Sequence, residues 1–222
     1  MKTGLAKVRA KMKELYKSKL RELQQGKATY WDAQEGNHEI RICPSWAGAK
    51  GLFYKEVPTH YGLGPDHKLS GTCSGEQCLA CKKAAKLSSS SFVKKQKRGE
   101  RLMVKTRIAM NIVDLSNPEK VVIWTTAPTN LQELLILAGD ADYEDFYSPK
   151  HGYNIKVSRT GKRLATKWKL RPVKNSSKLR GWKKILKPQL FNLDKRFRPL
   201  EASKMAALLR GENIYEKRKD DE

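Results

Sequence analysis

The stretch MVKTRIAMNIV, residues 103–113, determines the expected fold class. Its residues alternate with a period of two, which is the pattern of a β-strand that buries one face. One face would carry Val104, Thr106, Ile108, Met110 and Ile112, and the other Lys105, Arg107 and Asn111. The β-branched run VVIWT at 121–125 follows across an Asn117-Pro118 turn. The two runs together predict an antiparallel hairpin.

Strand patterns also predict further strands at 39–43, 53–60, 154–159 and 164–171. The last two flank the turn Thr160-Gly161-Lys162-Arg163 and form a second hairpin. Helical patterns cover 1–25, 129–137 and 199–210, and the positive stretch 94–107 is expected to begin as a mobile loop. Several short strands with few helices predict a mainly β (α+β) chain, built as an OB-fold-like barrel with a zinc-binding loop insertion and flanked by N- and C-terminal helices.

The expected domain organisation follows from these elements. Residues 1–27 form a basic helical arm, with Leu5, Val8 and Met12 among its apolar stripe. Residues 28–198 form the OB-like core, with a zinc subdomain at about 53–87. Residues 199–222 form a C-terminal helix and a short charged tail. The arm could pack on the core, or it could contact a neighbouring copy or a nucleic-acid backbone.

Charge is distributed unevenly along a chain whose formal net charge is +23. Residues 156–187 contain 13 Lys or Arg and no Asp or Glu, whereas 108–155 contain seven acids and only two lysines. A segment of one sign suits a phosphate backbone, so the pattern predicts a nucleic-acid partner. No apolar run approaches the roughly 20 residues that span a bilayer. A soluble, intracellular protein without a membrane partner is therefore expected.

Three of the four cysteines lie close together in the sequence. Cys78 and Cys81 form a C-x-x-C pair and Cys73 precedes them, a spacing that predicts one structural Zn²⁺. The fourth ligand would be His60 or His67, and we favour His60 at the end of the strand 53–60. A thioredoxin-like redox pair is the rival, but it requires a strand before the pair and a helix after it.

The candidate nucleic-acid contacts combine cations on the two hairpins with aromatic side chains, because unpaired bases stack on aromatic rings. They are Arg41, Trp46, Tyr61, Lys105, Arg107, Trp124, Lys156, Arg159, Lys162, Arg163, Lys167 and Lys169. Trp168 shares a face with Leu164 and Leu170, which favours the core for its ring. Cys43 lies in an apolar strand and is expected to be a buried thiol.

An enzyme is the least favoured class. The chain has no H-E-x-x-H motif, and its acids concentrate at 140–145, apart from the basic hairpins. A zinc-stabilised RNA-binding or transcription factor is the main alternative to a DNA-binding protein.

Three segments together resemble the T4-type bacteriophage single-stranded DNA-binding (helix-destabilising) proteins. They are EGNHEIRICP at 35–44, the ordered set His60, Cys73, Cys78 and Cys81, and GYNIKVSRTG at 152–161 followed by ATKW at 165–168. The similarity runs in patches from about Trp31 to Leu179.

The resemblance implies an OB-fold with a zinc-bearing insertion. It also implies that the protein acts in the cytoplasm of an infected bacterial host. It implies cooperative coating of single-stranded DNA during replication, recombination and repair, with the basic arm contacting neighbouring copies. Phage replication proteins are implied partners. The family's long acidic tail, however, is represented here only by 216–222, where Lys217, Arg218 and Lys219 accompany four acids, and the gap between Cys73 and Cys78 is short for the family.

Overall fold

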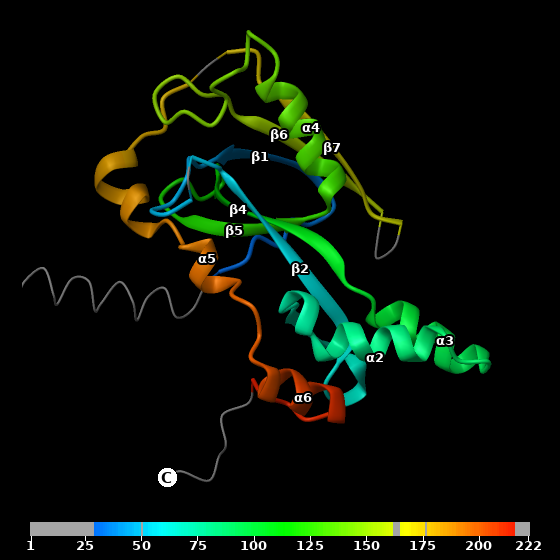
Figure 1. The fold of residues 1–222 in the computed structure, drawn as a ribbon. Helices are drawn as coiled ribbons and strands as arrows, with labels where there is room; N and C mark the ends of the chain where they lie inside the picture. The colour runs from blue at the N-terminus through cyan, green and yellow to red at the C-terminus, as the bar shows by residue number, and fades with distance from the viewer. Residues whose placement is uncertain (1–28, 50, 162–164, 176, 216–222) are drawn as a thin grey trace, which may run out of the picture. The chain divides into compact units, whose positions relative to one another are not determined.

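The structure is a computed structural model that describes residues 29–49, 51–161, 165–175 and 177–215 (Figure 1). The described elements are five α-helices, several short helical turns and one mainly antiparallel, open sheet of seven strands. Their hydrogen-bonded order is β3-β2-β4-β1-β6-β7, and β5 pairs with β4. The expected OB-like barrel is not shown by this open sheet and stays a prediction. The N-terminal helix expected at 1–25 lies outside the described residues.

The strands are β1 (Gly36–Ile42), β2 (Tyr54–Leu63), β3 (Leu69–Thr72), β4 (Lys105–Asp114), β5 (Val121–Thr126), β6 (Ile155–Thr160) and β7 (Lys167–Pro172). The helices are α2 (Leu79–Ser88), α3 (Val93–Leu102), α4 (Pro128–Ala138), α5 (Leu193–Arg196) and α6 (Ala202–Arg210). Short helical turns lie at Pro65–His67, Gly75–Gln77, Trp182–Leu186 and Lys187–Gln189. The strands read from alternation and the helices at 129–137 and 199–210 are thereby confirmed.

The chain divides into two compact units. The first takes the described part of Met1–Tyr54 together with Met110–Thr125 and Thr129–Asn192. The second takes Lys55–Ala109, Thr126–Pro128 and the described part of Leu193–Glu222. The zinc region expected at about 53–87 falls mainly within the second unit, which also contains α6.

The first unit is built on antiparallel strands that bury apolar side chains. β1 pairs with β6 from Gly36↔Arg159 to Ile40↔Ile155, and β6 pairs with β7 through Val157↔Leu170. Five of the fully buried side chains of this unit are Ile40, Ile42, Ile112, Ile123 and Ile155. β-Branched residues are favoured at such positions because they pack well on a pleated surface.

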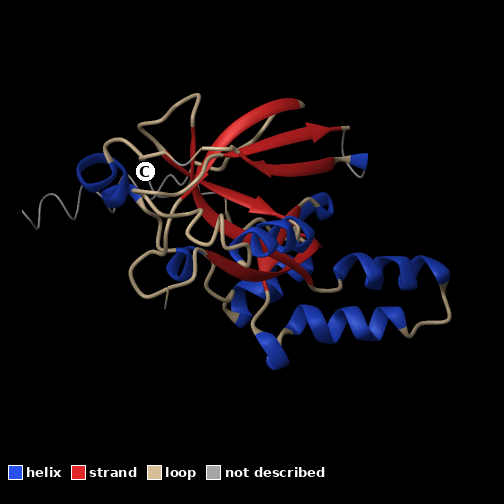
Figure 2. Cartoon of the chain, turned by 90° about the horizontal axis from the view of Figure 1, so that it is seen from above, coloured by secondary structure: helices blue, strands red, loops and turns tan. Residues whose placement is uncertain are grey.

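In the second unit, α2 and α3 form a helical hairpin (Figure 2). The stretch 94–107 was expected to begin as a loop, and this prediction is wrong because α3 occupies Val93–Leu102. The helix buries only Gly99 and Leu102. A Cβ at Gly99 would lie 2.4 Å from Ser88 Oγ and 2.9 Å from the Ala84 carbonyl oxygen, so glycine allows α3 to approach α2 closely. Because the segment is mostly charged, its sequence gave no apolar pattern from which this packing could be predicted.

Candidate metal centre and cationic surfaces

Three elements of the second unit deliver four metal-binding side chains to one place. His60 comes from β2, which pairs with β3 through His60↔Gly71. Cys73 follows β3 directly, and its backbone N–H donates to the Pro58 carbonyl oxygen at 2.8 Å. Cys78 is the extended N-cap residue of α2, and Cys81 lies in the first turn of that helix. Residues three apart on a helix face the same side, so the C-x-x-C pair converges.

The donor atoms of His60, Cys73, Cys78 and Cys81 all lie within 4.8 Å of one another. His60 Nε2 is 3.3 Å from Cys78 Sγ and 3.5 Å from Cys81 Sγ, and the Sγ atoms of Cys73 and Cys81 are 3.6 Å apart. His60, Cys73 and Cys78 are buried and Cys81 is half-buried. This geometry is consistent with a single structural metal site.

His60 is oriented by its other ring nitrogen. Nδ1 lies 2.7 Å from the Leu102 carbonyl oxygen, so Nδ1–H donates there and Nε2 is left as the ligand atom. A backbone carbonyl that holds the second nitrogen is a common support for metal-binding histidines. His67, the other candidate, is exposed in the turn Pro65–His67, so the structure selects His60.

The sulfur atoms influence one another's ionisation. Burial raises the pKa of Cys78, but hydrogen bonds from the backbone of Ser74, Cys81 and Ala80 outweigh it and bring that pKa to about 6. Burial and the adjacent Cys73 sulfur raise the pKa of Cys81 to about 12. A bound cation would stabilise all three thiolates together, because metal binding releases the thiol protons.

The rival redox interpretation fits one part of the structure, since α2 follows the C-x-x-C pair as a thioredoxin-like motif would require. A third cysteine and a buried histidine at the same point favour metal binding. Cys43, by contrast, lies in the first unit with no exposed surface. Burial raises its pKa to about 12, as a buried structural thiol requires.

The β6–β7 hairpin of the first unit presents a positive face. The strands pair Lys156 with Arg171, Ser158 with Lys169 and Thr160 with Lys167, so these residues share one side of the ribbon. Lys156, Lys167, Lys169 and Arg171 are all exposed. In the described parts of the chain none of the four has an ion-pair partner. We call these four residues the hairpin cations.

The opposite face of the hairpin is apolar. Val157 and Leu170 are buried there, and the Trp168 ring lies 5.8 Å from Trp124 and 6.2 Å from Trp31, centroid to centroid. Arg159, a predicted phosphate contact, lies on this side. Its guanidinium is 5.6 Å from the Trp168 ring and donates to the Ala33 carbonyl oxygen. Arg159 therefore supports the aromatic cluster.

Three predicted nucleic-acid contacts are corrected by their burial. Arg41 has no exposed surface, and its guanidinium donates to Asn154 Oδ1 at 3.0 Å, to the Ser148 carbonyl oxygen at 3.1 Å and to Ser177. Burial lowers the pKa of Arg41 to about 10. Trp46 and Trp124 are 6% and 1% exposed, so neither offers a ring face to a base. The expectation that Trp168 leans into the core agrees with its contacts.

Five predicted contacts remain. Lys105 is exposed and Arg107 half-buried near the start of β4, in the second unit. Tyr61 is 37% exposed on β2, also in the second unit. Lys162 and Arg163 lie outside the described residues, and the contact role assigned to each of these five stays a prediction.

The structure adds cations that the candidate set omitted. Arg171 completes the hairpin cations, and its alternation with Lys167 and Lys169 could have identified it. The helical hairpin adds seven exposed ones: Lys82, Lys86, Lys94, Lys95, Lys97, Arg98 and Arg101. Five of them lie in the stretch 94–107, and its expected start as a loop gave no reason to place these five on one helix.

Comparison with protein-family models and with curated proteins gives no match for this chain. Among the helices that the structure describes, none combines the length and apolar character needed to cross a bilayer.

Proposed function

We propose that this protein binds single-stranded nucleic acid, preferentially DNA, through the hairpin cations, and that His60, Cys73, Cys78 and Cys81 hold one structural zinc ion. The observation that carries the proposal is the hairpin itself. One face is anchored in the core by Val157 and Leu170, and the other presents four exposed cations on neighbouring paired strands.

The arrangement of the hairpin cations favours a polyanionic ligand. Lys156 and Arg171 are direct cross-strand neighbours, and like charges in that position destabilise a hairpin by roughly 0.2–1 kcal/mol. Glu39 pairs with Lys156 in the sheet, but its carboxylate accepts a hydrogen bond from Asn154 at 2.7 Å. A phosphate backbone would relieve the repulsion and release counterions, which supplies most of the affinity of sequence-tolerant binding.

Zinc is the metal that the donor set fits best. A tetrahedral zinc ion has Zn–S bonds of about 2.3 Å and Zn–N bonds of about 2.0–2.1 Å, which place sulfurs about 3.8 Å apart and sulfur and nitrogen about 3.6 Å apart. The Cys73–Cys81 sulfur separation of 3.6 Å comes close to the first value, and the separations of 3.3 and 3.5 Å between His60 Nε2 and the sulfurs of Cys78 and Cys81 come close to the second. One His and three Cys fill all four positions, as in structural rather than catalytic sites.

The resemblance to T4-type single-stranded DNA-binding proteins supports the choice of DNA, an OB-like arrangement of the core, and roles in phage replication, recombination and repair within the host cytoplasm. Binding to neighbouring copies and to phage replication proteins belongs to the same proposal. The function requires no covalent chemistry, because stacking and phosphate contacts suffice.

The test is a titration of a labelled oligo(dT) with the zinc-loaded chain at several salt concentrations, beside a duplex and an RNA of matched length. We expect tighter binding to the single strand than to the duplex and a steep salt dependence. Lys167→Ala should lower the slope of log K against log salt by about one, since one phosphate contact is lost.

Lys120→Ala is the matched control, because Lys120 is an exposed lysine of the same unit in the turn between β4 and β5. Equal affinity for the duplex and the single strand would contradict the proposal. A slope that Lys167→Ala leaves unchanged would remove this residue from the contact surface. Stronger binding to the matched RNA would favour the RNA-binding alternative.

A further inference from the structure

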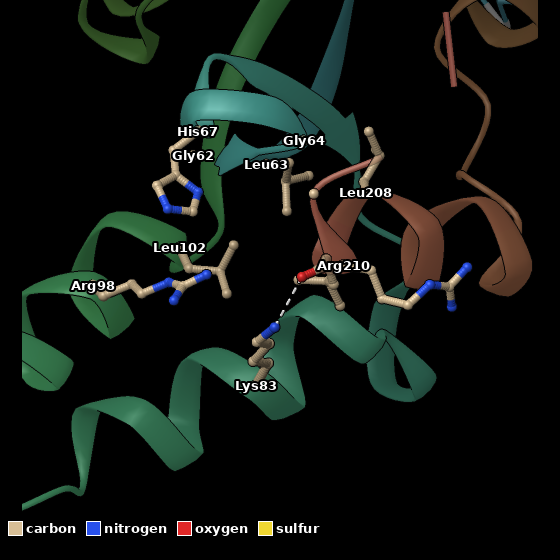
Figure 3. Close-up of a pocket in the computed structure, with 11 residues that line it drawn as sticks. Gly62, Leu63, Gly64, His67, Lys83, Arg98, Leu102, Leu208 and Arg210 are labelled. Carbon is tan, nitrogen blue, oxygen red and sulfur yellow. Dashed lines mark hydrogen bonds between the residues drawn. The ribbon is translucent and has the colours of Figure 1, made fainter. Parts of the chain in front are cut away.

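A small pocket lies wholly within the second unit, beside the metal centre (Figure 3). Its volume is about 70 Å³. Gly62, Leu63 and Gly64 at the end of β2, Leu102 of α3, and residues 208–211 at the end of α6 form most of its wall. Leu63, Leu102 and Leu208 belong to the same buried cluster as Cys73 and Cys78, so the pocket has a buried apolar base.

Three basic side chains from separate elements converge on this space, namely His67, Lys83 and Arg98. Figure 3 shows the His67 ring, the Lys83 ammonium and the Arg98 guanidinium directed into it, whereas the Arg210 guanidinium points away. Arg210 is paired with Glu212 at 2.5 Å. No Asp or Glu is among the lining residues.

The hydrogen-bonding capacity of these side chains is largely unused. Within the described ranges, the side chains of Arg98 and His67 have no hydrogen-bond or ion-pair partner. Lys83 Nζ donates to the Leu209 carbonyl oxygen at 3.0 Å, which leaves two of its three N–H groups. The carbonyl groups that end α6 would favour a cation, but those of Ala207, Leu208 and Leu209 already accept hydrogen bonds.

The backbone that presents His67 is in an uncommon conformation. Asp66 and His67 have φ values of 52° and 57° without being glycine. Such conformations occur in a few per cent of residues and cluster at ligand sites, where the surroundings hold them. The backbone N–H of His67 donates to the Gly64 carbonyl oxygen at 3.3 Å, which fixes the turn at the edge of the pocket.

We infer that this pocket is a binding site for a single phosphate group, held by Arg98, Lys83 and His67. A planar guanidinium and an ammonium are the groups that proteins use to bind phosphate oxygens. The phosphate could come from the backbone of a bound strand or from a free anion, and both present the same oxygens. The site does not depend on the β6–β7 hairpin, so it can be tested apart from the proposed function.

The experiment is a titration of the zinc-loaded, full-length chain with inorganic phosphate at constant ionic strength, followed by NMR of the assigned backbone amides. We expect saturable shifts at Gly62, Gly64, Leu102 and Gly211, which line the pocket. Arg98→Ala should weaken binding about tenfold or more, since a charge-assisted hydrogen bond is lost. Arg101→Ala is the control, because Arg101 is exposed on the same helix but does not line the pocket.

A second variant guards against loss of structure. His67→Asn removes the imidazole while keeping a residue that tolerates the left-handed conformation, and it should also weaken phosphate binding. Absence of saturable shifts in the wild-type chain would overturn the inference. Undiminished phosphate binding by the double variant Arg98→Ala, His67→Asn would overturn it as well.

A parallel titration with oligo(dT) identifies the source of the phosphate. If a strand enters the pocket, the same amides shift and Arg98→Ala lowers the salt slope by about one. If only the free anion binds, Arg98→Ala loses the response to phosphate and keeps the slope for DNA. Phosphate binding by a chain that fails to bind DNA would refute the proposed function and leave this site intact.

Discussion

Replacing Cys78 by serine tests the metal centre most directly. Cys78 is fully buried, its Sγ lies 3.3 Å from His60 Nε2, and it is one of the four clustered donors. Loss of a residue that only orients a ligand reduces metal affinity about 10–100-fold, so loss of a ligand itself should cost more than about 100-fold. We expect Cys78→Ser to retain well under one equivalent of zinc.

Loss of the metal should also unfold the second unit, because its apolar core is small. The buried residues around the ligands are few and partly small, such as Ala80 and Ala84 beside Leu63 and Leu102. Structural zinc contributes about 10–16 kcal/mol in zinc-finger peptides, whereas whole domains are stable by only about 5–15 kcal/mol. The second unit should therefore lose its helices when the metal is lost.

The chain provides separate reporters for its two units. All five tryptophans, at 31, 46, 124, 168 and 182, lie in the first unit. In the second unit α2 and α3 have ten residues each and α6 has nine, against eleven in α4. Cys78→Ser should reduce the far-ultraviolet helical signal while tryptophan fluorescence stays near that of the wild-type protein.

Cys43→Ala is the matched control, since Cys43 is equally buried but lies in the first unit. It should keep one zinc per chain by elemental analysis and keep the helical signal. The reasoning would be refuted by a Cys78→Ser protein with full zinc content. It would also fail if chelation removed the metal and left the helical signal unchanged.

Three further substitutions test the packing. Burial raises the pKa of Asp114, but hydrogen bonds from Ser116 and Trp31 outweigh it and hold that pKa below its usual range. The carboxylate therefore adds stability above about pH 4, and this stability is lost as pH falls through the lowered pKa. Asp114→Asn should cost about 1 kcal/mol at neutral pH in urea unfolding, and it should weaken the loss of stability at acid pH. Gly99→Ala should destabilise the helical hairpin by about 1–3 kcal/mol because its Cβ would meet Ser88 Oγ at 2.4 Å, whereas Gly139→Ala, with no neighbour closer than 3.6 Å, should change stability little in thermal unfolding. Arg41→Met should cost about 3 kcal/mol or more, since it leaves several buried acceptors unpaired; the salt slope for oligo(dT) should not change, and a reduced slope would return Arg41 to the contact surface.

The strands could be predicted from the sequence because their signal is local. Alternation along 103–113 locates β4, and the parity of Lys167, Lys169 and Leu170 separates the two faces of β7 before any partner is known. The cysteine spacing likewise indicates a metal site, since a C-x-x-C turn lets two thiolates bind the same ion. These parts depend on residues a few positions apart.

Burial and long-range partners were decided only by the tertiary structure. Arg41 belongs to a strand that suits a phosphate contact as well as a core, and it donates hydrogen bonds to residues more than 100 positions away. The sequence favoured His60 over His67 but left both open, and the structure brings His60 to the cysteines, with its Nδ1 held by the Leu102 carbonyl oxygen. Gly99 allows helix α3 to pack closely against α2, and this contact cannot be read from the charged segment itself. Each outcome depends on which surfaces pack together in the fold, and this tertiary context overrides the local preferences that a short stretch of sequence expresses.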